Sequence, residues 1–179
     1  MNERESYLIF PKTEKAIKER VVILKEKAKK IGQSGVFGMD DGDAMDGNEM
    51  LRARVEISEL NGEVARTNKL LAMSKVWDEE KVNEQVFDSV KLGSRVVAIV
   101  RYPDGERERL NFSVGSTLDA DVRFHPQKPY GHGIISIETP FVQAILGAAK
   151  GDTRAYESKM GIVEVEVRRV SKSPYITGC

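Results

Sequence analysis

Cysteine and histidine are scarce in this sequence, which limits the chemistry that the chain can carry out alone. Its 179 residues include one cysteine, Cys179, and two histidines. An intramolecular disulfide is therefore impossible, and a cysteine-based zinc site has no ligands. His125 and His132 stand among prolines and glycines without an acid or cysteine pattern for metal or triad chemistry, so we expect ordinary surface histidines.

Long apolar runs and an excess of one charge are also missing. No stretch of about 18 apolar residues could cross a bilayer, and residues 1–6 carry charges where a signal peptide has an apolar segment. Lysine plus arginine and aspartate plus glutamate balance at 28 each, so no global field draws the chain to nucleic acid or membrane. We expect a cytoplasmic protein without a membrane partner, whose electrostatic function depends on local clusters of charge.

Two segments of the N-terminal half have the heptad pattern of coiled-coil helices. Apolar residues recur at alternating steps of four and three from Ile17 to Ile31, and again from Met50 to Leu71, where Thr67 is the one polar member. Two such helices and a joining loop predict an antiparallel hairpin. At 1.5 Å per residue the second segment would extend roughly 33 Å, which holds the loop well away from anything folded behind it.

Beyond Trp77 the periodicity changes to the alternation of strands. Ser94–Arg101 and Arg107–Val114 flank a Pro-Asp-Gly turn and indicate a β-hairpin. From residue 163 to 168, valines alternate with charged residues, as in a strand with one buried face. A short helix is expected to begin at Pro140.

These patterns predict the α+β class: an N-terminal antiparallel coiled-coil hairpin, followed by a small antiparallel sheet packed on a short helix that Thr139 caps. We expect four segments along the chain: a hairpin domain at residues 1–78, a charged linker at 79–89, a C-terminal domain at 90–170 and a tail at 171–179.

The loop between the predicted helices, at about residues 38–49, is crowded with carboxylates. Five acidic residues fall within ten positions and are interrupted by glycines: Asp40, Asp41, Asp43, Asp46 and Glu49. One interpretation is a solvated loop whose carboxylates cap the second helix. A calcium loop of the EF-hand type is set aside, because its spacing and its closing bidentate glutamate are missing.

Another interpretation of the loop is an incomplete metal site. Asp43 and Asp46 are three residues apart and can lie on one face of a turn, but two ligands alone seldom hold Mg²⁺, which wants six oxygens and keeps its waters. If the active-site carboxylates of another enzyme supplied the remaining ligands, the tip could stabilise a weakly held second metal and activate water for phosphodiester hydrolysis.

A motif in the second half of the chain points to a family. The run from Ile134 to Asp152 contains Ile-Ser, then Thr-Pro, a short apolar helix and Gly-Asp. It resembles the signature of Gre-type transcript-cleavage factors, and residues 90–93 and 161–170 resemble the first and last segments of the Gre C-terminal domain. At the tip, Gly42-Asp43 followed by Asp46 is similar to the Gre tip, where Gly-Asp precedes an acidic residue three positions on.

The tip also departs from the Gre pattern. Gly32, Gly35 and Gly38 stand where the first Gre helix normally continues, which predicts a longer or looser tip. The added Asp40 and Asp41 are reminiscent of the Gre homologue whose aspartate-rich tip blocks the polymerase instead of assisting RNA cleavage.

The resemblance implies a DNA-binding transcription elongation factor that is not itself an enzyme. Its hairpin would enter the secondary channel of RNA polymerase, and its FKBP-like C-terminal domain would dock at the channel rim through Pro140 and Phe141. Asp43 and Asp46 would then help the polymerase's catalytic aspartates to coordinate Mg²⁺ and stimulate the polymerase's own cleavage of backtracked RNA. A monomer is expected, and further candidate metal ligands are Asp40, Asp41 and Glu49.

Other residues and other functions are left open by the sequence. Arg52, Arg54, Lys29 and Lys30 are candidates for contacts with RNA or with the channel, although they can equally form a solvated surface. The nearest alternative function is a Gre-homologue inhibitor that plugs the same channel. An alternative of another class is an FKBP-type prolyl isomerase, which needs an aromatic-lined pocket that the aromatics of the C-terminal domain would have to form.

Overall fold

The computed structural model describes residues 8–37, 47–78, 84–125 and 133–176. They form two compact units, one made of residues 15–73 and the other of the described residues up to 14 together with those from 74 onward. We call them the hairpin unit and the sheet unit. In the described part of the chain, no helix is both long and apolar enough to span a membrane.

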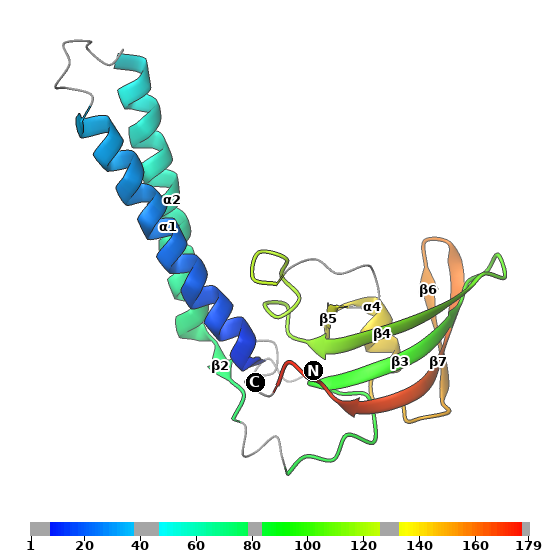
Figure 1. Ribbon diagram of the computed structural model, residues 1–179. Coiled ribbons are helices and arrows are strands. Elements are labelled where there is room, and N and C mark those ends of the chain that lie inside the picture. The colour runs from blue at the N-terminus through cyan, green and yellow to red at the C-terminus, as the bar shows by residue number, and fades with distance from the viewer. Residues whose placement is uncertain (1–7, 38–46, 79–83, 126–132, 177–179) are drawn as a thin grey trace. The chain divides into compact units, whose positions relative to one another are not determined.

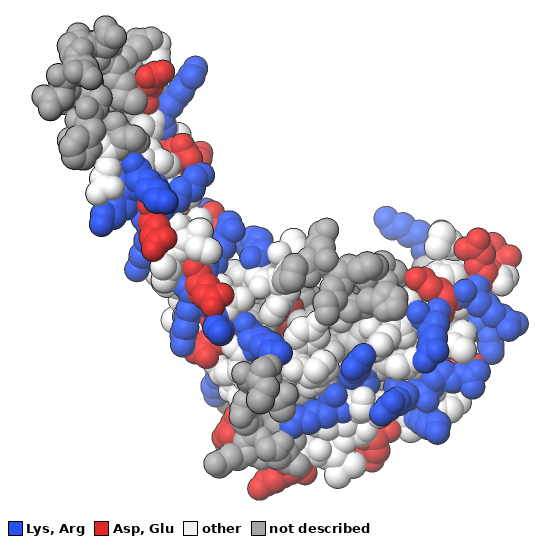
Figure 2. Space-filling view, in the orientation of Figure 1, with Lys and Arg blue, Asp and Glu red and all other residues white. Residues whose placement is uncertain are grey.

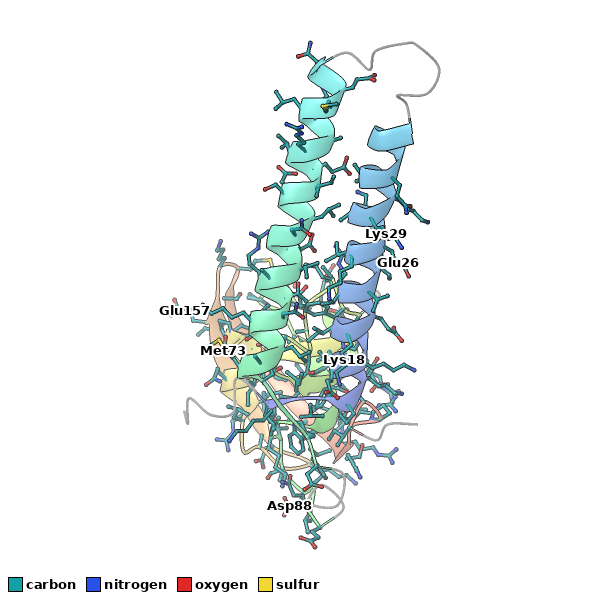
Figure 3. The ribbon with its side chains drawn as sticks, turned by 90° about the vertical axis from the view of Figure 1, so that its left-hand side faces the viewer. Lys18, Glu26, Lys29, Met73, Asp88 and Glu157 are labelled. Atoms are coloured by element: carbon teal, nitrogen blue, oxygen red, sulfur yellow. The ribbon has the colours of Figure 1, made fainter. Side chains whose placement is uncertain are left out.

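The hairpin unit contains two long helices, α1 (Pro11–Phe37, whose first turn belongs to the sheet unit) and α2 (Gly47–Met73), which lie side by side (Figures 1 and 3). Every residue of the two predicted seams is buried or half-buried, whereas most neighbouring positions are exposed. The predicted antiparallel hairpin is confirmed. The seam residues are Ile17, Val21, Leu24, Ala28 and Ile31 on α1, and Met50, Ala53, Ile57, Leu60, Val64, Thr67 and Leu71 on α2.

Two ion pairs fix the register of the helices. Arg20 Nη2 lies 2.9 Å from Glu63 Oε1, and Lys27 Nζ lies 2.9 Å from Glu56 Oε1. The second pair is one heptad later on α1 and one heptad earlier on α2, which is the relation that antiparallel helices require. Because these side chains are partly exposed, each pair contributes at most about 1 kcal/mol and mainly selects the register.

The glycines near the end of α1 do not interrupt it. The helix continues through Gly32 and Gly35 as far as Phe37. The predicted longer or looser tip concerns residues 38–46, which lie outside the described residues. A helix of 27 residues is about 40 Å long, so the hairpin is longer than the seams alone suggested.

The sheet unit is built on five strands with the order β5-β4-β3-β7-β6 (Figure 1). The expected strands and turn are present, and the α+β class is confirmed. The sheet is mixed rather than wholly antiparallel, because β5 pairs with β4 in parallel. The strands are β3 (Ser94–Arg101), β4 (Arg107–Gly115), β5 (Ile134–Ser136), β6 (Thr153–Ser158) and β7 (Gly161–Lys172).

The core of this unit lies between one face of the sheet and the helix α4 (Pro140–Ile145). Alternate residues of β3 and β7 are buried, as period-two strands with one covered face require. Thr139 caps α4, since its side chain accepts a hydrogen bond from the Val142 amide. The apolar residues of the helix complete the core: Phe141, Val142 and Ile145.

Segments from both ends of the described chain are tied into the sheet unit. The short strands β1 (Leu8–Ile9) and β2 (Lys75–Val76) pair in parallel. Residues 171–176, which were expected to belong to a tail, continue β7 and then bury Ile176 completely. Trp77 and Phe10 contribute to the same core.

Candidate functional site

The acidic segment predicted as the working tip joins the ends of α1 and α2. Asp40, Asp41, Asp43 and Asp46 lie outside the described residues. Glu49 is described: it is exposed in the first turn of α2, where a carboxylate interacts favourably with the positive end of the helix dipole.

The described residues do not form a metal site of their own. Across the described ranges, no group of three or more His, Cys, Asp or Glu side chains is placed to hold a metal ion. Of the five candidate ligands only Glu49 can be placed, on an exposed helical turn. The tip offers only oxygen donors, the donor type that Mg²⁺ prefers. This donor set fits Mg²⁺.

Exposed cations stand on both helices within about two turns of the acidic segment. Arg52 and Arg54 are exposed near the start of α2, and neither forms an ion pair with another described residue. Lys29 and Lys30 are exposed toward the end of α1. Figure 3 shows Lys29 beside Glu26 on α1. The hairpin thus presents cations behind its acidic segment, which suits contact with a polyanion on the way to the tip.

The two residues predicted to dock differ in exposure. Pro140 is exposed at the first position of α4, whereas Phe141 is only 6% exposed. The Phe141 ring lies 5.3 Å from that of Phe112 and 6.0 Å from that of Tyr156, measured between centroids. A partner can touch Pro140 directly, while Phe141 holds the helix in place from beneath.

A buried carboxylate connects the start of α1 to the loop after β4. Asp119 is fully buried and accepts hydrogen bonds from the Phe10 amide at 2.9 Å, from Thr13 Oγ1 at 2.5 Å, and from the amide and hydroxyl of Ser116 at 2.9 and 2.8 Å. Burial raises the pKa of Asp119 above its usual value, and the hydrogen bonds from Thr13, Phe10 and Ser116 oppose this rise.

His125 belongs to the same network, so the expectation of an ordinary surface histidine is wrong for it. Its ring is half-buried, with Nε2 2.8 Å from Thr13 Oγ1. When the Thr13 hydroxyl donates its one proton to Asp119, the Nε2 of His125 is the donor in its contact with Thr13 Oγ1. Burial lowers the pKa of His125, and nearby Asp119 and Asp121 oppose this change. His132 lies outside the described residues.

The aromatic side chains of the sheet unit mostly fill the core. Phe112, Phe124 and Phe141 are buried. A hollow of about 520 Å³ is present elsewhere on this unit, and Trp77 is the one aromatic side chain among the described residues that line it. The aromatic-lined pocket that a prolyl isomerase needs is therefore not formed by these three side chains. The other residues that line the hollow are Leu8, Gln85, Lys91, Leu92, Ile137, Gln143 and Leu146.

Comparison with known proteins agrees with the motif found in the second half of the chain. Residues 84–172 match the family model described as "Transcription elongation factor, GreA/GreB, C-term". The chain is 27% identical over 147 residues to transcription elongation factor GreA of Thermoanaerobacter pseudethanolicus, covering 82% of each chain. It is 23% identical over 168 residues to GreA of Shouchella clausii, covering 94% of this chain and 98% of the relative.

Among solved structures, the chain is similar to GreA factor homolog 1 (Gfh1) of Thermus thermophilus, with 19% identity and a TM-score of 0.37, covering 92% of this chain and 97% of that one. It is also similar to a GreA/GreB elongation factor of Nitrosomonas europaea, with 24% identity and a TM-score of 0.34, covering 60% of this chain and 78% of that one.

Proposed function

We propose that this chain, which belongs to the Gre-type family of transcription elongation factors, acts on RNA polymerase by inserting its hairpin into the secondary channel. There it stimulates the polymerase's intrinsic Mg²⁺-dependent cleavage of backtracked RNA, and it has no complete active site of its own. The proposal rests on the family relationship and on the form of the hairpin unit. We place this activity in the cytoplasm and assign it to a monomer.

One observation carries the proposal. Two helices of 27 residues run antiparallel, and a nine-residue segment with four aspartates joins them. A hairpin about 40 Å long can bring carboxylates to a site that a globular domain cannot enter. The seam and the two interhelical ion pairs give the hairpin a defined register, which is needed to present its end in one place.

The chain's own residues are assigned three roles in this proposal. Asp43 and Asp46, with Asp40, Asp41 and Glu49 as further candidates, share a Mg²⁺ ion with the polymerase's carboxylates. The metal supplies water activation and charge stabilisation for phosphodiester hydrolysis. Behind the tip, Arg52, Arg54, Lys29 and Lys30 contact the extruded RNA or the channel, and their exposure leaves them accessible.

We assign docking on the outside of the channel to the sheet unit. Pro140 offers an exposed, rigid contact at the start of α4. Phe141 anchors the same turn in the core. The sheet unit thereby supplies affinity, and the hairpin unit supplies the group that acts.

The number of aspartates favours a second candidate function, inhibition through the same channel. Asp40 and Asp41 add negative charge beside the two assigned ligands. A tip that binds the metal without leaving room for RNA or nucleotide would block the polymerase instead of assisting it.

A stalled, backtracked polymerase complex distinguishes the two functions. The chain is added with Mg²⁺, and the length of the RNA and the addition of the next nucleotide are followed in parallel. Shortened RNA, extendable again from its new 3′ end, supports cleavage stimulation. Blocked nucleotide addition without shortening contradicts it and supports the inhibitor. A peptide assay for proline isomerisation, run on the full chain, tests the remaining alternative, for which the Trp77 hollow is the candidate pocket.

A further inference from the structure

The outward face of the sheet is unusually rich in arginine. We call this surface the arginine face. Figure 2 shows lysine and arginine side chains gathered over the strands of this unit. Most inward residues of the same strands are apolar and buried, so the arginines gather on the other side. The arginine face consists of Arg95 and Arg101 on β3, Arg107 and Arg109 on β4, and Arg168 and Arg169 on β7.

The register brings these arginines close together. Arg101 is directly opposite Arg107, and Arg109 is opposite Ile99 in the next outward row. Directly opposite residues of paired strands are about 5 Å apart, and alternate residues of one strand are about 7 Å apart. Like charges directly opposite each other destabilise a sheet. Stability alone therefore does not explain why arginine occupies both positions of the Arg101–Arg107 pair.

A bulge adds a further arginine to this face. The pairing of β3 with β7 shifts between Val97 and Ala98, which are opposite Arg169 and Val167. Arg168 is the extra residue. Strict alternation would send one of two consecutive residues into the core, but here Arg168 and Arg169 are both exposed. Bulges often redirect a side chain in this way beside functional sites.

Two glutamates neutralise only part of this charge. Arg101 pairs with Glu164 at 3.6 Å and Glu166 at 3.1 Å, and Arg168 pairs with Glu166 at 3.3 Å. The remaining four arginines form no ion pair with any described residue; Arg95 donates only to the Asn111 side chain at 3.0 Å. They are Arg95, Arg107, Arg109 and Arg169.

We propose that the arginine face binds the phosphate backbone of double-stranded DNA. The guanidinium group forms paired hydrogen bonds with phosphate oxygens, and it is the cation of choice where such recognition matters. The cations of α1 are, by contrast, mostly lysines. This inference adds a site to the proposed function and rests on it only in placing the chain near transcribed DNA.

The chemistry of the face favours duplex DNA over other polyanions. Single-strand binders stack bases on aromatic side chains, and none of the outward residues on the described strands β3, β4 and β7 is aromatic. On the central strand β3 the apolar Val97 and Ile99 separate the arginines, but Arg169 lies opposite Val97 and Arg109 lies opposite Ile99 on the two neighbouring strands. The face as a whole therefore carries the charge that matches a polyanion. Backbone contacts without base contacts imply binding that is independent of DNA sequence and sensitive to salt.

Binding of the full chain to a labelled duplex of about 20 base pairs, measured by fluorescence anisotropy at several salt concentrations, tests this inference. The test variant is Arg107→Gln with Arg109→Gln. The matched control is Lys150→Gln with Lys159→Gln, which removes two exposed cations of the same unit that also lack a described ion pair. Because the full chain also carries the lysines of α1, the decisive quantity is the difference between the two variants.

Each phosphate contact adds about 0.9 to the slope with which the logarithm of the affinity falls as the logarithm of the salt concentration rises. One contact therefore costs about a 3.5-fold loss of affinity when the salt concentration rises fourfold. We expect the arginine variant to lower the slope by about 1.8 and the lysine control to leave it nearly unchanged, with coincident thermal unfolding of all three proteins.

Equal slopes for the two variants overturn the proposal. An equal loss of binding to single-stranded RNA overturns the assignment to duplex DNA, and a loss of polymerase binding alone identifies a protein partner instead. No polymerase is present in the DNA assay, so its failure leaves the proposed function untouched.

Discussion

At the scale of single residues, Asp119 holds the start of α1 against the sheet unit. It accepts hydrogen bonds from Phe10 and Thr13, which are more than a hundred residues away in the chain. Its pKa is raised above 3.8 by burial, so the folded state binds a proton more readily than the unfolded state does. The stability that this linkage contributes is fully present below pH 3.8 and is lost as the pH rises through the folded-state pKa.

Replacing Asp119 by asparagine gives the first prediction. One carboxylate oxygen of Asp119 accepts from Phe10 and Thr13, and the other accepts from Ser116. The amide nitrogen of asparagine replaces one of these oxygens and cannot accept a hydrogen bond, so one of the two groups of donors loses its acceptor. The free energy of unfolding should therefore fall by about 1–3 kcal/mol. The variant also loses the titration. The difference in unfolding free energy from the parent protein is therefore largest below pH 3.8 and shrinks as the pH rises toward 7.

Urea unfolding followed at several pH values measures this difference. Asp104→Asn is the control, because Asp104 is exposed and accepts a hydrogen bond from the Glu106 amide within its own turn. A difference that grows toward neutral pH would contradict the raised pKa of Asp119.

Pro140 and Phe141 give the second prediction, because adjacent residues of one turn have different roles. Pro140→Ala should cost no more than about 1 kcal/mol of stability, but should weaken polymerase binding at least about 5-fold if Pro140 is a binding contact. Phe141→Ala should cost about 3–5 kcal/mol of stability by leaving a cavity in the core. Competition binding to polymerase, together with urea unfolding, measures both effects.

Pro103→Ala is the matched control for docking, since Pro103 is another exposed proline of the sheet unit. Equal polymerase binding by the Pro140 variant and the parent protein would remove Pro140 from the docking surface.

Sequence patterns predict least at the residue scale. Asp119 and Asp121 look alike in the sequence, and only the tertiary contact with Thr13 decides which of them is fully buried. The same contact makes His125 part of a network. The tip aspartates are the opposite case, because their type and spacing carry the prediction without any tertiary contact.

At the scale of elements, Gly32 gives the third prediction. It lies within α1, where glycine costs about 1 kcal/mol relative to alanine. A Cβ at this position would meet only Ile57 Cδ1 at 3.9 Å, an ordinary contact. Gly32→Ala should therefore stabilise the hairpin unit by about 0.5–1 kcal/mol, measured by chemical unfolding followed at a helical circular dichroism band.

Gly105→Ala is the counterpart of this variant in the sheet unit. Gly105 has a φ of 88°, in the left-handed region, so alanine should destabilise the turn by about 1–2 kcal/mol although nothing lies within 4 Å of the new methyl group. If Gly32→Ala also destabilises the chain, the prediction is contradicted, and α1 requires glycine at this position for a reason other than helix propensity.

The elements with a strong periodic pattern were predictable, and the short ones were not. The seams of α1 and α2, and the alternation in β3 and β7, follow from one buried face. Strand β5 has three residues, too few to show a period, and its parallel pairing with β4 is decided by the tertiary fold. Strand β6 lies at a sheet edge with mostly exposed residues, so it lacks the alternation by which strands are recognised.

At the scale of the whole molecule, the proposed function divides the work between two units. The sheet unit carries the family motif, the exposed Pro140 to which docking is assigned, and the arginine face. The hairpin unit carries the acidic segment, and the ion pairs at Arg20 and Lys27 set its register. The central claim of the proposal is that Asp43 and Asp46 act inside the polymerase by sharing a metal ion with its carboxylates.

The most direct test is the rate of RNA shortening in a backtracked polymerase complex, measured with Asp43→Ala/Asp46→Ala at a concentration that saturates binding. Glu26→Ala/Glu59→Ala is the matched control, since it removes two exposed carboxylates of the same hairpin that form no described ion pair. We predict that the aspartate variant binds polymerase but loses at least about 10-fold in stimulated cleavage, the scale expected when groups that support a metal are removed, while the control keeps its activity. Unchanged cleavage by the aspartate variant would contradict the assignment of these residues as metal ligands.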